Sequence, residues 1–233
     1  MDDPPAAGHA PRIDRLGDAA LIVTLSDELD LRANAWARRA AAELAVRRAA
    51  VPGLGAAVPG HASVLVSFDP ERCGEAALRS LLATVLDATG RRETATGRRE
   101  TAADGVLHEI VVGYGGTDGP DLADVAARTG LSEDQVVALH SGVEYRVLVL
   151  GFLPGFPYLG VVPAPLDLPR RATPRLRVPA GSIAIAGRQT GIYPFESPGG
   201  WHLIGRTHAP LWDVQRDHPA LLSPGDRVRF VPS

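Results

Sequence analysis

Hydrophobic and polar positions follow two different periods in the first 90 residues. The apolar runs at residues 20–25 and 63–68 are typical of strands. Between and after them, apolar residues recur every three or four positions, which predicts two helices with one buried stripe each. The stripes are Leu29, Ala33, Trp36, Ala40 and Leu44, and then Leu78, Leu81, Leu82 and Val85. This order predicts a small sheet covered by helices on one side.

The pattern changes in the second half of the chain. We expect a strand at residues 106–112 and short helices at 121–128 and 132–140, the second opened by the capping pair Ser132 and Gln135. Further on, short apolar runs alternate with Gly and Pro, which predicts strands in a sandwich or closed barrel. These runs are 147–150, 183–186, 203–204 and 228–231.

A polar segment separates the two halves. Residues 90–95 read GRRETA, and residues 97–102 repeat the same letters. A segment without apolar periodicity cannot bury a face, so we interpret residues 90–104 as a linker. The predicted class is α+β. The predicted parts are a disordered tail at 1–10, a small α/β domain at 11–89, and a barrel or sandwich domain at 105–233.

Composition excludes several kinds of chemistry. The chain has 233 residues and no lysine, so its 24 Lys and Arg positions are all arginine. A Schiff-base lysine, a biotinyl-lysine and a P-loop lysine are therefore excluded. Any anion that the protein binds must be held by arginine, by backbone N–H groups or by a partner.

Charge and cysteine content bear on the location and the partners of the chain. A net charge of -3 with interspersed signs argues against nucleic-acid binding. The N-terminus has no apolar stretch typical of a signal peptide, and no run approaches the ~20 residues of a membrane span. The single cysteine, Cys73, has no partner for an intrachain disulfide. We therefore expect a cytoplasmic protein without a membrane anchor.

His140 is the best general acid–base candidate in the chain. It lies on the same helical face as Val136 near a helix C-terminus, where the helix dipole favours a protonated imidazole. A satisfied structural histidine is the alternative. The histidines show no metal-ligand spacing, so we expect no metal site. Asp118 and Asp121 are better interpreted as helix-start caps than as a metal pair.

Arginines gather in one short segment of the second half. Arg170, Arg171, Arg175 and Arg177 alternate with prolines, which reduce the entropy lost on ordering a loop. A guanidinium binds carboxylate and phosphate through two parallel hydrogen bonds. Arg175 and Arg177 share parity, so in an extended stretch they point to the same side. This pair is a candidate anion site, and a solvated edge is the alternative.

Three further polar residues are site candidates. Gln189 and Arg206 lie beside glycines, where a ligand can approach the backbone closely, although such glycines also serve barrel corners and turns. Glu196 precedes a Gly-rich loop and is a candidate acid or base, or else it caps a turn.

Aromatic residues lie in two Gly- and Pro-rich segments. Phe152, Phe156 and Tyr158 occur in GFLPGFPYLG, and Trp201 ends ESPGGW. We expect these side chains to line a pocket or an interface rather than simply to fill a core.

Several long segments carry a family resemblance. They are GFLPGFPYLG, PRRATPRLRVPAGSIAIAGRQTG and ESPGGWHLIGRT, with RTGLSEDQVVALHSGVEYRVLVLGF upstream, IDRLGDAALIVTL near the start and LLSPGDRVRF near the end. In this order they resemble the KipI / allophanate-hydrolase-subunit-1 family, whose members include the B subunit of prokaryotic 5-oxoprolinase. The resemblance covers nearly the whole chain except the N-terminal tail and the duplicated segment.

The resemblance implies both a fold and a function. The second domain would be a cyclophilin-like β-barrel. The chain would act with two partners, the C-type protein, which is homologous to it, and the A-type protein, in ATP-dependent opening of 5-oxoproline to glutamate. ATP with Mg²⁺ would belong to the complex. Alternatives are an inhibitor of a sensor histidine kinase, the carboxyltransferase component of a urea carboxylase or allophanate hydrolase, and, by fold analogy alone, a prolyl isomerase.

Overall fold

The structure is a computed structural model that describes residues 10–95 and 105–233. The chain forms two compact units, divided between residues 102 and 103. Each unit has its own hydrophobic core within the described residues, so each is described separately below.

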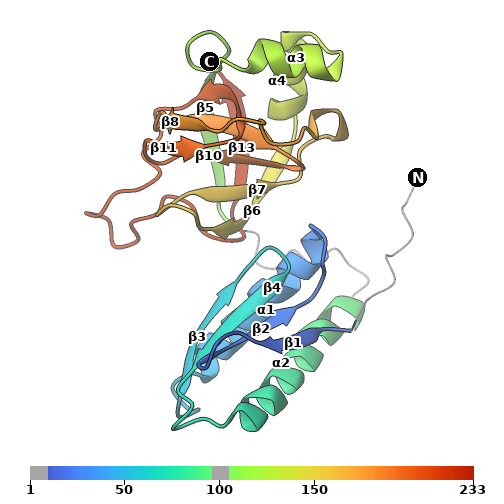
Figure 1. Ribbon diagram of the computed structural model, residues 1–233, viewed down its shortest axis with the longest axis vertical. Coiled ribbons are helices and arrows are strands. Elements are labelled where there is room, and N and C mark those ends of the chain that lie inside the picture. The colour runs from blue at the N-terminus through green and yellow to red at the C-terminus, as the bar shows by residue number, and fades with distance from the viewer. Residues whose placement is uncertain (1–9, 96–104) are drawn as a thin grey trace. The chain divides into compact units, whose positions relative to one another are not determined.

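The N-terminal unit is a four-stranded antiparallel sheet with two helices (Figure 1). The burial of its strands alternates, so only one face of the sheet is covered, and α1 and α2 share a core with that face. The elements are β1 (Arg12–Arg15), β2 (Ala20–Thr24), α1 (Leu31–Arg47), β3 (Leu54–Pro59), β4 (Ser63–Phe68) and α2 (Glu75–Ala95), with sheet order β1-β2-β4-β3. The polar β1 and the small-residue β3 carry no strong strand pattern and were not predicted.

Helix α1 begins after the first residue of its predicted apolar stripe. Asp30 is the N-cap, and its carboxylate accepts hydrogen bonds from the backbone N–H groups of Arg32 and Ala33. Leu29 therefore lies before the helix. The buried face is made mainly of alanine and ends at Leu44.

Helix α2 extends further than predicted. It runs to Ala95 and so includes the first copy of the duplicated GRRETA segment. Interpreting residues 90–95 as linker was therefore wrong, because an existing helix is extended at little cost and Arg, Glu and Ala are good helix formers. Gly90 has a packing reason, since a Cβ there would press against the Trp36 ring. The second copy and residues 1–9 of the predicted tail lie outside the described residues.

The second unit is a closed barrel with the strand order β10-β7-β6-β13-β5-β12-β9. Neighbours pair antiparallel except β13 and β5, which pair in parallel. Closure decides between the predicted sandwich and barrel, and the α+β class with a cyclophilin-like barrel is confirmed. The strands are β5 (Leu107–Tyr114), β6 (Glu144–Leu150), β7 (Pro157–Gly160), β9 (Ser182–Ala186), β10 (Gln189–Ile192), β12 (His202–Arg206) and β13 (Arg227–Pro232).

Two helices and a ribbon complete this unit. Helices α3 (Leu122–Thr129) and α4 (Glu133–Ser141) lie together at one end of the barrel (Figure 1). The predicted capping pair at the start of α4 is confirmed. A 3-10 turn (Ala164–Leu166) follows β7. The ribbon consists of β8 (Arg175–Val178) paired with β11 (Ser197–Gly199).

Strand β9 is buried on both of its faces. Ile183 and Ile185 belong to the barrel core, whereas Ala184 and Ala186 belong to a second, smaller core that also contains Val178 of β8. Alternating large and small residues along SIAIA let another layer approach the small-residue face closely. This second core lies beside the residues that form the candidate site.

Candidate functional site

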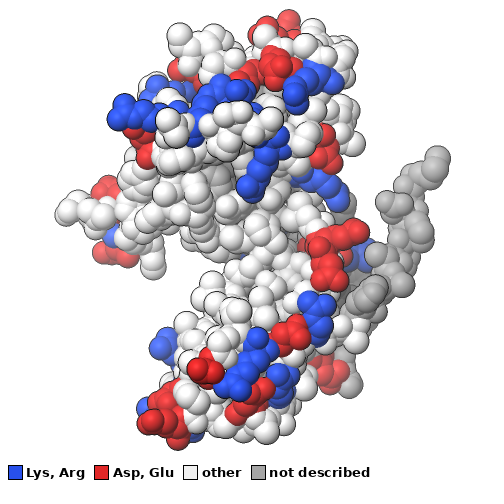
Figure 2. All heavy atoms as spheres, in the orientation of Figure 1, with Lys and Arg blue, Asp and Glu red and all other residues white. Residues whose placement is uncertain are grey.

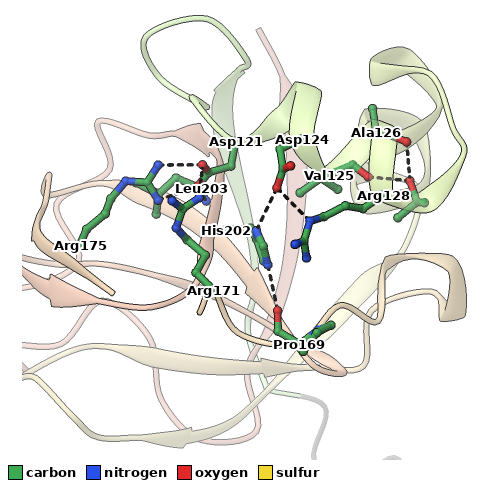
Figure 3. A network of polar contacts seen from close by, with 11 residues as sticks. Asp121, Asp124, Val125, Ala126, Arg128, Pro169, Arg171, Arg175, His202 and Leu203 are labelled. Carbon is green, nitrogen blue, oxygen red and sulfur yellow. Dashed lines mark hydrogen bonds and ion pairs between the residues drawn. The ribbon is translucent and has the colours of Figure 1, made fainter. Parts of the chain in front are cut away.

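Asp121 is the centre of a polar network between α3, the arginine loop and β12. Its carboxylate accepts hydrogen bonds from Arg171 Nη1 and from both Nη atoms of Arg175, each at 2.7 Å (Figure 3). A fourth bond comes from the backbone N–H of Leu203, also at 2.7 Å. Asp121 occupies the N-cap position of α3, as predicted, but its side chain caps no helix N–H group. Its role as an arginine partner was missed.

The arginines set the electrostatics of this network. Burial alone would raise the pKa of Asp121, but hydrogen bonds from Arg175 and Leu203 and the charges of Arg175 and Arg171 outweigh it and lower that pKa. Asp121 is therefore ionised at neutral pH. Two cations share one buried anion, so the cluster of Asp121, Arg171 and Arg175 carries one excess positive charge.

Two buried nitrogen atoms of the same network have no hydrogen-bond partner. His202 donates from Nε2 to the Pro169 carbonyl oxygen at 2.9 Å, which fixes the proton on Nε2. Its Nδ1 is an orphan, with Asp124 Oδ2 3.9 Å away (Figure 3). Arg171 Nε is the second orphan. Unpartnered buried polar atoms are uncommon in native structures, so they mark this network as a candidate site. Sequence reasoning had set His202 aside for lack of metal-ligand spacing.

Arg175 and Arg177 have different environments despite their shared parity. The Arg175 side chain is 24% exposed and is committed to Asp121. The Arg177 side chain is 81% exposed, and its Nε lies 3.3 Å from Oε1 of Glu196, which is itself exposed. Figure 2 shows basic side chains on this face of the barrel unit, interspersed with acidic ones. Arg175 thus binds a carboxylate of the chain itself, whereas Glu196 directly precedes β11 and pairs with Arg177 instead.

The structure does not bring Gln189 and Arg206 together. Gln189 pairs with Ala186 at one end of β9, whereas Arg206 pairs with Ser182 at the other end. Four residues of strand separate these positions by about 13 Å. Arg206 donates from Nε to the Ala180 carbonyl oxygen at 2.9 Å. Neighbouring glycines gave no information on which end of a strand each residue occupies.

His140 is a buried, neutral and fully hydrogen-bonded residue. The Thr190 hydroxyl donates to the Ala184 carbonyl, so it accepts from His140 Nε2–H at 2.9 Å, and Nδ1 accepts from the Tyr114 hydroxyl at 2.7 Å. Burial lowers the pKa of His140 to about 3. The expected protonated imidazole is therefore wrong, because desolvation outweighs the helix dipole. The environment of His140 instead fits the alternative, a satisfied structural histidine.

The aromatic candidates divide into buried and exposed residues. Phe156 and Trp201 belong to the second core with ring centroids 5.9 Å apart, so core filling is their main role. Tyr158 is half-buried against both. Phe152 is 60% exposed and lies edge-on to Phe156 at 5.5 Å. Tyr193, which sequence reasoning did not select, is buried beside Phe156 at 5.1 Å.

The remaining observations concern the N-terminal unit and the described residues in general. An open hollow of about 790 Å³ in the N-terminal unit is lined in part by Arg48, Ser67 and Arg72. In residues 10–95 and 105–233, no group of three or more His, Cys, Asp or Glu side chains could hold a metal ion. Within the same ranges, no helix combines the length and the apolar character needed to cross a membrane.

The sequence matches the family described as carboxyltransferase domain, subdomain C and D, over residues 11–222. The chain belongs to this family. The matched range includes every residue of the Asp121 network and of the aromatic cluster.

Two relatives are similar to this chain over nearly their whole length. The chain is 46% identical over 218 residues to the B subunit of 5-oxoprolinase from Escherichia coli O157:H7, which covers 93% of this chain and 94% of that protein. It is 37% identical over 224 residues to the B subunit of 5-oxoprolinase from Bacillus subtilis strain 168, covering 94% and 92%.

A solved structure, that of TTHA0988, superimposes with a TM-score of 0.76 at 42% identity. The match covers 92% of this chain but only 40% of TTHA0988. A unit like this one is therefore part of a longer chain in that protein.

Proposed function

We propose that this chain is the B subunit of an ATP-dependent 5-oxoprolinase complex, which converts 5-oxoproline, ATP and water into glutamate, ADP and phosphate. The observation that carries this proposal is the 46% identity to the B subunit of 5-oxoprolinase from Escherichia coli O157:H7 over nearly the full length of both chains. The partners that this assignment requires are the A-type and C-type proteins of such a complex.

A shared active site fits the chemistry available to this chain. An unreactive lactam carbonyl needs activation, for which phosphorylation by ATP is the simplest route, and the γ-phosphoryl group then needs cations around it. In a lysine-free chain, arginine is the only side chain that carries a permanent positive charge for phosphates. We therefore assign ATP with its Mg²⁺ to the assembled complex rather than to this chain alone.

Residues of the barrel unit have distinct roles in this proposal. Asp121 and Arg175 hold the arginine loop in place, and the excess positive charge of the network favours an anionic ligand at Arg171. Glu196, exposed just before β11, is our acid–base candidate, provided that a partner protein encloses it. Arg177, Gln189 and Arg206 stay predicted anion contacts at separate positions of the barrel unit.

Reconstitution tests this function. The purified chain alone is expected to release no glutamate from 5-oxoproline and to hydrolyse no ATP. A mixture with its A-type and C-type partners is expected to release glutamate only when ATP is present. Omission of each protein in turn serves as the control. Absence of glutamate from the complete mixture would contradict the assignment, and inhibition of histidine-kinase autophosphorylation would then favour the inhibitor alternative.

A further inference from the structure

Tyr193 combines a buried ring with an unpartnered hydroxyl group. Only 2% of the residue is exposed, and no described residue forms a hydrogen bond with the hydroxyl. The hydroxyl oxygen is not among the fully buried orphan atoms, so it reaches the surface. A Cβ at position 199 would overlap this hydroxyl, so Gly199 keeps it uncovered. A polar group presented in this way is available to a ligand.

Arg170 is near enough to Tyr193 for its charge to act on this hydroxyl. The backbone N–H of Arg171 donates to the Gly200 carbonyl at 2.8 Å, which places the arginine loop beside Gly199 and Gly200. Burial raises the pKa of Tyr193 to about 12, and the nearby charge of Arg170 opposes that rise. Arg170 is exposed, and no carboxylate among the described residues forms an ion pair with it. Its guanidinium is therefore free to bind an anion.

Phe152 supplies an exposed aromatic ring at the same place. Its φ of 70° makes it the one described non-glycine residue with a left-handed backbone. Such a conformation is unfavourable for a bulky residue and clusters at functional sites. The ring is 60% exposed and lies edge-on to Phe156 and Tyr193, with centroid distances of 5.5 and 6.4 Å. The loop thus holds Phe152 in an unfavourable backbone conformation that leaves its ring exposed and edge-on to the Tyr193 ring.

We propose that Arg170, the Tyr193 hydroxyl and the Phe152 ring bind a small carboxylate that has a flat ring. The guanidinium would pair with the carboxylate, the hydroxyl would donate a second hydrogen bond, and the substrate ring would pack on Phe152. This inference rests on the proposed function, in which 5-oxoproline is such a molecule. It assigns substrate binding to Arg170 and leaves Arg175 as the support of the loop.

The test uses the three-protein complex with Arg170→Gln and Tyr193→Phe variants. Tyr193→Phe keeps the buried ring, so thermal unfolding should be unchanged. Loss of a hydrogen bond to a charged group is expected to raise the KM for 5-oxoproline roughly tenfold. The kcat and the KM for ATP are expected to stay the same. Arg188→Gln removes another exposed arginine, on the turn between β9 and β10, and should change none of these values.

Equilibrium dialysis of 5-oxoproline without ATP separates binding from turnover. In both variants, its Kd should rise by the same factor as the KM. Competition by 2-pyrrolidinone, which lacks the carboxylate, should be unchanged by Arg170→Gln. Unchanged 5-oxoproline binding in both folded variants, or equal weakening of both compounds by Arg170→Gln, would overturn the inference. A wild-type complex that binds 5-oxoproline in this manner but releases no glutamate would contradict the proposed function and leave the binding site standing.

Discussion

Arg175 and Arg177 are two positions apart on β8, but they differ in burial, in the carboxylate that they bind and in the distance to it. Arg175 is mostly buried and makes two 2.7 Å hydrogen bonds with Asp121, which is 4% exposed. Arg177 is 81% exposed and pairs with the exposed Glu196 at 3.3 Å. The same residue type in the same strand is thus part of the fold at one position and of the solvated surface at the other.

This difference shows why the contribution of an ion pair to stability cannot be judged from its distance alone. An exposed pair gains little because water solvates the separated charges almost as well. In a buried pair, removal of one partner leaves the other desolvated and unpaired, so the loss is large even if the intact pair adds little net stability. Substitutions at the two pairs should therefore have very different effects on the free energy of unfolding.

The largest effect is expected from Asp121→Ala. This change leaves Arg171, Arg175 and the Leu203 N–H without their acceptor, and the barrel unit should lose about 3 kcal/mol of unfolding free energy. Urea unfolding followed by tryptophan fluorescence measures this loss. Glu196→Ala is the matched control on the exposed pair. Equal losses in the two variants would contradict the contrast between the pairs.

Arg175→Ala is expected to lower the unfolding free energy by a smaller amount, about 2 kcal/mol. In this variant Arg171 still neutralises the Asp121 carboxylate, and the Leu203 N–H still donates a hydrogen bond to it. Arg171→Ala removes a single hydrogen bond to Asp121 and should cost less than Arg175→Ala. The same urea titration compares the two variants. If Arg171→Ala proved the more destabilising, the two-bond fork of Arg175 would not be the main support of the loop.

His140 is buried like Asp121, but it is held neutral instead of charged. Its folded pKa is depressed to about 3, below the unfolded value, so its stabilising contribution is complete above pH 6.5 and is lost progressively as the pH falls toward 3. Between pH 6 and pH 5 this residue should contribute a fall of up to about 1.4 kcal/mol per pH unit.

Unfolding free energies measured at both pH values test this dependence. His140→Gln removes the titration and should flatten the pH dependence of the barrel unit, even if the variant is less stable at pH 7. An unchanged slope in His140→Gln would show that His140 does not titrate in this way.

The smallest effect is expected at the exposed pair. Arg177→Ala should change the unfolding free energy by no more than about 0.5 kcal/mol, and that change should shrink as salt is added. Urea unfolding at low and high ionic strength measures both effects. Turnover of the assembled complex gives the complementary measurement: a lower rate with unchanged stability would support Arg177 as an anion contact.

Sequence patterns predicted those parts of the fold that depend on neighbours along the chain. The Ser132 and Gln135 capping pair was correct because both residues belong to one helical turn. The apolar run at residues 183–186 predicted a strand, but not that its alanine face is covered by a second layer. The end of α2 was misplaced because a polar pattern does not reveal whether an existing helix continues.

The site shows where local reasoning stops. The sequence by itself determined that the chain has no lysine, that arginines gather near residue 170 and that Asp121 begins a helix. Only the tertiary structure decided that Asp121 binds Arg171, Arg175 and Leu203, which are 50, 54 and 82 residues away. It likewise decided that His140 is neutral. Helix caps and dipoles act over one turn, whereas burial depends on distant segments that remove water and thereby set the strength of every charge.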